Sequence, residues 1–119
     1  MVELISNMRN LTPKELDIIT ALIDAGDPKW HSLKETLPDA LVSEMNDGGM
    51  GSLKFIKESD KDRKLGHVIN EAEYIDDDGV TVSIVLNLDE DGDLYELDIW
   101  KVDFSKLINL PNKDHHRPD

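Results

Sequence analysis

The feature that most constrains the fold is a run of alternating residues between Val80 and Leu88. Every second side chain in this run is apolar, and successive side chains on a β-strand point to opposite faces of a sheet. One face of the strand therefore packs inward, whereas Thr81, Ser83 and Asn87 point the other way. The inward positions are Val80, Val82, Ile84, Leu86 and Leu88. The chain must therefore build a sheet with one buried face.

The first part of the chain has the period of an α-helix instead. Thr12 can cap the first free amides, Pro13 suits the first helical position, and Glu15 can reach back to complete a capping box. Apolar residues follow at helical spacing, and Gly26 ends the helix. They are Leu16, Ile19, Leu22 and Ile23. We expect a second, shorter helix over about residues 30–37 that stops before the following proline.

Further strands are predicted around the central one. They span residues 41–45, 52–57, 65–75 and 93–102, with turns rich in Gly or Asp between them. Because short connections usually join neighbouring antiparallel strands, we expect an antiparallel meander of about five strands with the N-terminal helices packed on it. This is an α+β fold in a single domain over residues 1–110, followed by a flexible polar tail over residues 111–119.

Charge indicates which partners the chain can bind. It carries 26 acidic and 13 basic residues, which gives a net charge of −13. Sixteen of the acidic residues but only seven of the basic ones lie in residues 60–119. Such a negative surface repels nucleic acid and anionic lipid, and it accelerates encounter with a basic partner. We therefore expect a basic protein partner, and no binding to nucleic acid or membrane.

The chain has no cysteine, which excludes disulfides and thiolate metal sites. Residues 1–10 lack the charged start and the long apolar run of a secretion signal. No segment approaches the ~20 apolar residues that a membrane-spanning helix needs. We expect a soluble cytoplasmic protein that is a monomer or a weak dimer.

Three motifs could carry chemistry, and each lacks a necessary part. Residues 47–52 have the glycines of a phosphate loop, but no Lys follows the last glycine and the next segment is strand-like. Residues 89–93 alternate like calcium ligands, but the loop lacks glycine at its sixth position and Glu at its twelfth. Glu96 and Asp98 share a sheet face, but no aromatic platform for a sugar accompanies these carboxylates. We expect no catalysis, no cofactor and no resident metal.

The last strand combines acidic and aromatic side chains on one face. Glu96, Asp98 and Trp100 alternate there, and tryptophan together with desolvated charge commonly dominates the binding energy of protein interfaces. The acidic turns before and after the central strand add further carboxylates. The residues predicted to bind a partner are Asp76, Asp77, Asp78, Asp89, Asp91, Glu96, Asp98 and Trp100.

Three blocks of sequence carry a resemblance to a known family. They are DGGMGSL at residues 47–53, DGV at residues 78–80 and LYELDIWKVDF at residues 94–104. Over roughly residues 9–110, the chain resembles a family of small bacterial proteins known only as a domain of unknown function. By type it is also similar to the immunity proteins of contact-dependent inhibition and other polymorphic toxin systems. That similarity implies a non-catalytic cytoplasmic protein that blocks a toxin domain by direct binding, and a nuclease presents the basic cleft that an acidic partner can occupy.

Two other kinds of function remain open on the sequence. An exposed strand edge could let the chain associate with itself as a regulatory or structural module. Alternatively, the glycine turn or the acidic loops could bind a small ligand or a divalent ion. An acidic surface also keeps a protein soluble whatever its function is.

Overall fold

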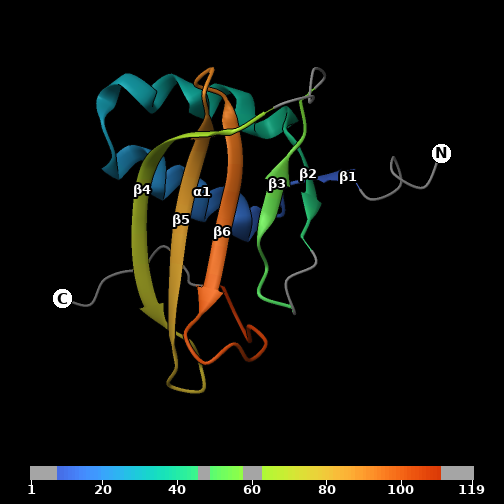
Figure 1. Cartoon of the computed structure of the whole chain (residues 1–119), viewed down its shortest axis with the longest axis vertical. Coiled ribbons are helices and arrows are strands. Elements are labelled where there is room, and N and C mark those ends of the chain that lie inside the picture. The colour runs from blue at the N-terminus through green and yellow to red at the C-terminus, as the bar shows by residue number, and fades with distance from the viewer. Residues whose placement is uncertain (1–7, 46–48, 58–62, 111–119) are drawn as a thin grey trace.

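One antiparallel sheet dominates the computed structural model, which describes residues 8–45, 49–57 and 63–110. Within these residues the strands are β1 (Met8–Asn10), β2 (Leu41–Glu44), β3 (Leu53–Phe55), β4 (Leu65–Ile75), β5 (Thr81–Asp89) and β6 (Leu94–Lys101). The helices α1 (Pro13–Ala25) and η2 (Pro28–Asp39) lie behind this sheet in Figure 1. The chain therefore has the α+β architecture that the sequence predicts. The predicted tail over residues 111–119 lies outside the described residues.

Helix α1 begins and ends where the sequence predicts. The Thr12 hydroxyl accepts a hydrogen bond from the Glu15 amide (3.2 Å), and the Glu15 carboxylate accepts one from the Thr12 amide (2.9 Å). The expected capping box is therefore present, and Gly26 forms the C-terminal cap. Ile19 and Ile23 are completely buried in the core between this helix and the sheet. Helix α1 thus covers one face of the sheet.

The second helix differs from its prediction in type and in length. It is a 3-10 helix that includes Pro38, whereas the sequence predicted a shorter helix that stops before this residue. A 3-10 helix consists of short turns, each closed by its own hydrogen bond, so the missing amide of a proline interrupts one turn without ending the element. Leu37 is buried and joins the helix to the core. No helix of the described ranges is long and apolar enough to cross a lipid bilayer.

The strand order departs from a simple meander. It is β1-β2-β3-β6-β5-β4, so the chain leaves β3, forms the far edge as β4, and returns through β5 to place β6 beside β3. Leu53 of β3 lies opposite Leu97 of β6, and both side chains are completely buried. This contact joins β3 to β6 within the apolar core. The sequence also missed β1, so the described sheet has six strands instead of about five.

The face toward α1 holds the apolar core. Val82, Ile84 and Leu86 of β5 are buried there, as the alternation predicts. Strand β6 departs from a strict alternation, because a shift in the β5–β6 register turns Leu94 inward. The next residue, Tyr95, is half-buried. The opposite face of β4, β5 and β6 carries no helix (Figure 1).

Candidate functional site

The sheet face opposite α1 collects acidic side chains. The register across β4, β5 and β6 places residues of the three strands side by side in rows. One row is Glu73, Ser83 and Trp100, and the next is Glu71, Val85 and Asp98. In the third row, Asn87 of β5 lies opposite Glu96 of β6. We call this surface the open face, and its residues are Glu71, Glu73, Ser83, Val85, Asn87, Glu96, Asp98 and Trp100. Glu71 and Glu73 are exposed on β4, and the carboxylates of β6 are half-buried. Four carboxylates thus share one side of a three-stranded region.

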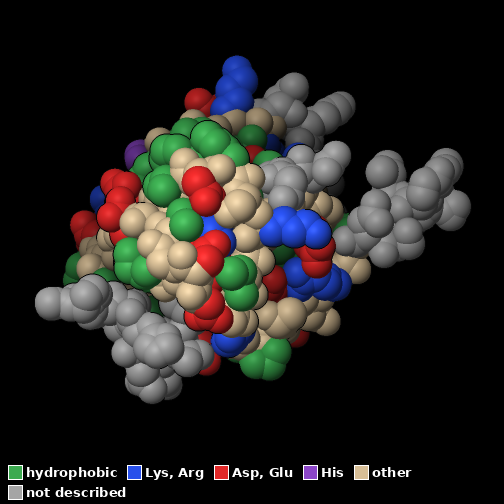
Figure 2. Space-filling view, turned by 90° about the horizontal axis from the view of Figure 1, so that it is seen from below, with side chains coloured by type: hydrophobic (Ala, Val, Ile, Leu, Met, Phe, Trp, Pro, Cys, Tyr) green, Lys and Arg blue, Asp and Glu red, His purple; other side chains and the backbone are tan. Residues whose placement is uncertain are grey.

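Exposed apolar side chains lie at one end of the open face. The side chains of Trp100 and Phe104 are 49% and 69% exposed, and their ring centroids lie 6.2 Å apart. Phe104 has a φ of 61°, which a residue with a side chain rarely adopts, and its amide donates to the Lys101 carbonyl (2.8 Å). Ile75 and Val102 are also exposed at this end. Figure 2, seen from this end, shows hydrophobic side chains gathered beside acidic ones. Such a patch is suited to anchoring a partner.

The ionised form of Glu96 on β6 is disfavoured by its surroundings. Burial raises the pKa of Glu96, and the carboxylate of Asp98 raises it further, while Lys54 on β3 acts in the opposite direction. The Asn87 side chain donates a hydrogen bond to Asp98 (2.8 Å). A raised pKa means that ionised Glu96 is less favourable in the folded chain than in the unfolded chain. Negative charge at this position therefore costs stability.

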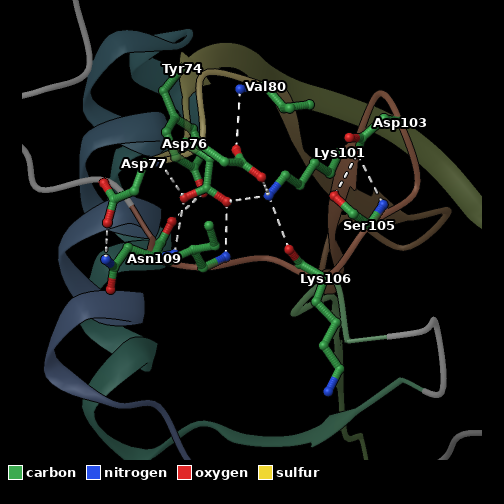
Figure 3. Close-up of polar contacts among 11 residues, drawn as sticks. Tyr74, Asp76, Asp77, Val80, Lys101, Asp103, Ser105, Lys106 and Asn109 are labelled. Atoms are coloured by element: carbon green, nitrogen blue, oxygen red, sulfur yellow. Dashed lines mark hydrogen bonds and ion pairs between the residues drawn. The ribbon is translucent and has the colours of Figure 1, made fainter.

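A buried lysine lies behind the acidic turn between β4 and β5 (Figure 3). Lys101 is completely buried, and its ammonium group donates to the carboxylates of Asp76 (2.9 Å) and Asp78 (2.6 Å). Its third hydrogen bond goes to the carbonyl of Lys106 (3.0 Å). Burial would lower the pKa of Lys101, but the two carboxylates raise it above its usual value. We call this arrangement the lysine clamp, and its single positive charge is shared by two acids of the turn.

Asp76 also holds the segment that follows β6. Its carboxylate accepts hydrogen bonds from the backbone amides of Ile108 (2.8 Å) and Asn109 (3.1 Å), as Figure 3 shows. Tyr74 donates its hydroxyl to the carbonyl of Asn109 (2.7 Å). Burial alone would raise the pKa of Asp76, but the lysine and the backbone amides lower it to about 2. The buried Asp76 carboxylate therefore links the turn to the C-terminal segment through hydrogen bonds.

The acidic turn between β5 and β6 has a similar buried ion pair. Asp89 is buried and accepts hydrogen bonds from the Arg63 Nε (2.9 Å) and the Lys57 Nζ (3.3 Å). Its other carboxylate oxygen accepts from the amides of Asp91 (2.9 Å) and Asp93 (3.0 Å). Burial would raise the pKa of Asp89, but these partners hold it below its usual value. This carboxylate, too, is directed into the protein.

The predicted partner-binding residues divide into three groups. Glu96, Asp98 and Trp100 lie together on the open face. Three others are exposed in the turns at the two ends of β5: Asp77, Asp78 and Asp91. The third group, Asp76 and Asp89, does not reach the surface. These two residues are corrected to internal positions, because Asp89 ends β5 and Asp76 directly follows β4, and each carboxylate meets a buried cation there.

Three residues at this surface were not predicted from the sequence to bind a partner. Glu71 and Glu73 belong to the same face as the acids of β6, and Phe104 lies against Trp100. The alternation of residues 65–75 carried the signal for the two glutamates, because it already separates their face from that of Tyr74. The predicted meander also makes β4, β5 and β6 neighbours, as the structure confirms, so the two glutamates could have been grouped with the acids of β6.

The glycine-rich turn receives another segment of the same chain. Residues 46–48 lie outside the described residues, whereas Gly49 and Gly51 have φ values of 86° and 91°. A Cβ at Gly49 would come within 3.0 Å of the Lys106 side chain, and one at Gly51 within 3.3 Å of Leu107. The Leu107 amide donates to the Gly49 carbonyl (3.1 Å). These glycines therefore have a structural use that requires no ligand.

A cavity of about 290 Å³ lies between η2 and the β5–β6 turn. Its wall combines apolar side chains such as Leu33 and Phe55 with the cations Lys57 and Arg63. Both cations already pair with Asp89, so their charge is used within the protein. Within the described ranges, no three acidic or histidine side chains converge in a way that could hold a metal ion.

Comparison with known proteins identifies a family. No curated protein matches the chain, and no solved structure matches it. The family described as Domain of unknown function (DUF6984) matches residues 8–111. This match spans both helices and every strand of the described sheet. The chain therefore belongs to the DUF6984 family of domains of unknown function.

Proposed function

We propose that the protein is a non-enzymatic immunity protein that binds a basic toxin domain through its open face and acts in the cytoplasm. The observation that carries this proposal is the position of Glu96 and Asp98 beside Trp100, with Glu71 and Glu73 on the same face. In the described structure no helix covers this face (Figure 1). An acidic surface with an exposed aromatic anchor favours a cationic protein partner.

The distribution of ion pairs supports this choice of surface. The buried acids of the two turns have Lys101 and Arg63 as partners. Among the described residues, Glu71 and Glu73 make no ion pair. Their charge is therefore not cancelled locally, and it acts on an approaching molecule within a Debye length of about 10 Å. The open face thus supplies attraction over a distance, and Trp100 supplies apolar contact after docking.

A nuclease is the toxin class that fits this chemistry. An enzyme that holds nucleic acid presents a cleft rich in Lys and Arg, because those side chains neutralise phosphates. Carboxylates on alternate positions of β6 and β4 can occupy such a cleft in place of phosphates. The toxin would then be neutralised by binding alone, and no catalytic residue of this protein would be needed.

The test is binding to the C-terminal domain encoded by the gene immediately upstream, measured by biolayer interferometry at several salt concentrations. Trp100→Ala should speed dissociation and weaken binding by about thirtyfold, because a tryptophan anchor contributes on the order of 2 kcal/mol. Glu96→Gln combined with Asp98→Asn should slow association and reduce its dependence on salt. Asp17→Asn is the matched control, because Asp17 is exposed on α1.

Each outcome of this experiment bears on the proposal. An unchanged complex after both open-face changes would remove the open face from the interface. Equal effects of the Asp17 control and the open-face variants would reduce the attraction to net charge alone. Failure of the unmodified chain to bind the domain would contradict the immunity function itself.

A further inference from the structure

Strand β4 forms one edge of the sheet and is regular over half of its length. It stands last in the strand order and has eleven residues. Irregular pairing is confined to the part before Asn70, and every residue from Asn70 to Ile75 has a partner on β5. An edge strand presents a row of backbone groups that can pair with another chain. This regular stretch has the length of a typical strand, about five to six residues.

The backbone groups that point away from β5 can be identified. The Asp76 amide donates to the Val80 carbonyl across the hairpin (2.9 Å), so the backbone of Asp76 faces β5. Because the backbone groups of successive residues point to opposite edges of a strand, those of Ile75, Glu73 and Glu71 face outward. The structure agrees at one further position.

That position is Glu71, whose amide donates to the side chain of Asn70 (2.9 Å) rather than to β5. No other described residue forms a hydrogen bond with the amides of Glu73 and Ile75 on the outer side. The side chains of these three outward residues are exposed on the same side of the sheet as the open face. Ile75 is 63% exposed. The edge therefore combines the available amides of Glu73 and Ile75 with two negative charges and one apolar side chain.

We propose that the outer edge of β4 from Asn70 to Ile75 binds an extended strand of the basic partner by antiparallel β-addition. Directly opposed side chains on adjacent strands interact, and opposite charges there are favourable. The added strand therefore carries Lys or Arg opposite Glu71 and Glu73 and an apolar residue opposite Ile75. This inference rests on the proposed function, because it states how the same partner is held.

A second copy of the chain fits this edge poorly. Antiparallel pairing of β4 with its own copy about Ala72 would place each Glu71 opposite a Glu73. Like charges directly opposite each other destabilise a strand pair. A strand with alternating basic residues meets no such repulsion, so the edge selects a basic partner over self-association.

The probe is the peptide acetyl-Thr-Val-Thr-Lys-Thr-Lys-Thr-amide, added to the full ¹⁵N-labelled chain and followed by NMR. Antiparallel addition sets Val opposite Ile75 and the two Lys residues opposite Glu73 and Glu71. Saturable shifts should appear in the amides of residues 70–75. N-methylation of the Val and Lys residues should weaken binding by about tenfold or more, because it removes the donors that face β4. N-methylation of the three Thr residues that follow the Val and Lys positions should leave affinity unchanged, because their amides face away.

Two variants of the protein give an independent comparison. Glu73→Thr removes a charge and keeps the outward amide, and it should weaken peptide binding by about twofold. Glu73→Pro also removes the outward amide, and it should weaken binding by about a further tenfold. Proline is tolerated at edge positions whose amide faces outward, so both variants should fold, as circular dichroism would show. If the proline variant does not fold, the N-methylated peptides on the unmodified chain decide the question.

The outcomes separate this inference from the proposed function. Shifts confined to β5 and β6, or equal binding of the two N-methylated peptides, would overturn strand addition and leave the open face as the docking surface. Absence of saturable shifts at millimolar peptide would overturn it as well. Failure of the proposed function shows in a different assay, as loss of the complex with the upstream domain.

Discussion

Asp76 and Asp89 of the two turns and Glu96 of the open face belong to the same excess of negative charge, but their ionisation acts on folding in opposite directions. Asp76 and Asp89 are buried against cations and backbone amides, which hold the pKa of each carboxyl below its usual value. Glu96 lies beside Asp98, and its pKa is raised. Ionisation of Asp76 and Asp89 therefore stabilises the fold, whereas ionisation of Glu96 destabilises it. Net charge alone does not distinguish these roles, whereas burial and partner do.

The buried acids of the two turns are paired with cations from different parts of the chain. Each contains a glycine with positive φ whose amide bonds to the carbonyl of the first aspartate, Gly79 to Asp76 (2.9 Å) and Gly92 to Asp89 (3.1 Å). The first turn is completed by Lys101 and the C-terminal segment, and the second by Arg63 from the segment before β4. The acidic turns thus hold distant segments onto the sheet. Among the described residues, Glu71 and Glu73 of the open face hold no distant segment in this way.

The largest expected effect comes from removing the cation of the lysine clamp. Lys101→Met leaves the buried carboxylate of Asp76 without its partner and loosens the segment bonded to it. Breaking a buried ion pair on one side costs about 3–5 kcal/mol. Urea unfolding followed by circular dichroism should show a loss of this size.

Lys106→Met is the matched control, because the Lys106 side chain is exposed and only its carbonyl contacts Lys101. Its effect should stay within about 0.5 kcal/mol. Similar losses in both variants would mean that the clamp contributes no more than any lysine of this segment. A tolerated Lys101→Met would abolish the contrast between turn and open face.

Acid should remove the contribution of Asp76 in a defined pH range. Its pKa is about 2 in the folded chain, below an unfolded value of about 3.9. The ionised carboxylate therefore stabilises the fold above about pH 4, and this contribution is lost as the pH falls toward 2. In urea titrations from pH 6 to pH 2, the unmodified chain should lose stability over this range. Asp76→Asn should start from a lower value and lose less, with the remaining slope contributed by groups such as Asp89.

Asp77→Asn provides the comparison for this experiment, because Asp77 is exposed next to Asp76 and bonds through its side chain only to Asn109. It should keep the slope of the unmodified chain. If Asp76→Asn loses stability with falling pH as steeply as the unmodified chain does, the acid sensitivity originates at other residues. Ionised Asp76 would then not be what stabilises the first turn.

The sequence predicted the elements whose signals are local. The capping residues Thr12 and Glu15 lie within one helical turn, and the alternation of β5 is continuous, so both were readable. Strand β1 has only three residues, too few for a visible period. The place of β6 beside β3 depends on contacts between distant segments, such as Leu53 with Leu97, which no local pattern encodes.

The site was predicted in part for the same reason. Glu96, Asp98 and Trp100 were found because alternation along one strand places them on one face. Lys101 follows the inward phase of Leu97 and Ile99, but a lysine is normally a surface residue, so its burial could not be foreseen without its acid partners. Those partners lie across the sheet in the turn after β4. Pairing across the sheet, rather than residue type, decides which acids are internal.

The smallest predicted effect is also the one that defines the open face most sharply. Glu96→Gln removes a charge that is half-buried beside Asp98, so it should raise stability at pH 7 by about 0.5 kcal/mol, the scale of a like-charge contact on a sheet. The pKa of Glu96 is raised in the folded chain, so its protonated form is favoured by folding. The gain of the variant should therefore be present at neutral pH and vanish below the unfolded pKa of about 4.3, where Glu96 is protonated in both states. Glu90→Gln in the β5–β6 turn, whose side chain is exposed, should show no such gain.

A Glu96→Gln variant that is more stable and yet binds the basic partner more weakly would show that this carboxylate is kept for binding at the expense of folding. A loss of stability in Glu96→Gln would instead place Glu96 with Asp76 and Asp89, as an acid that the fold itself requires.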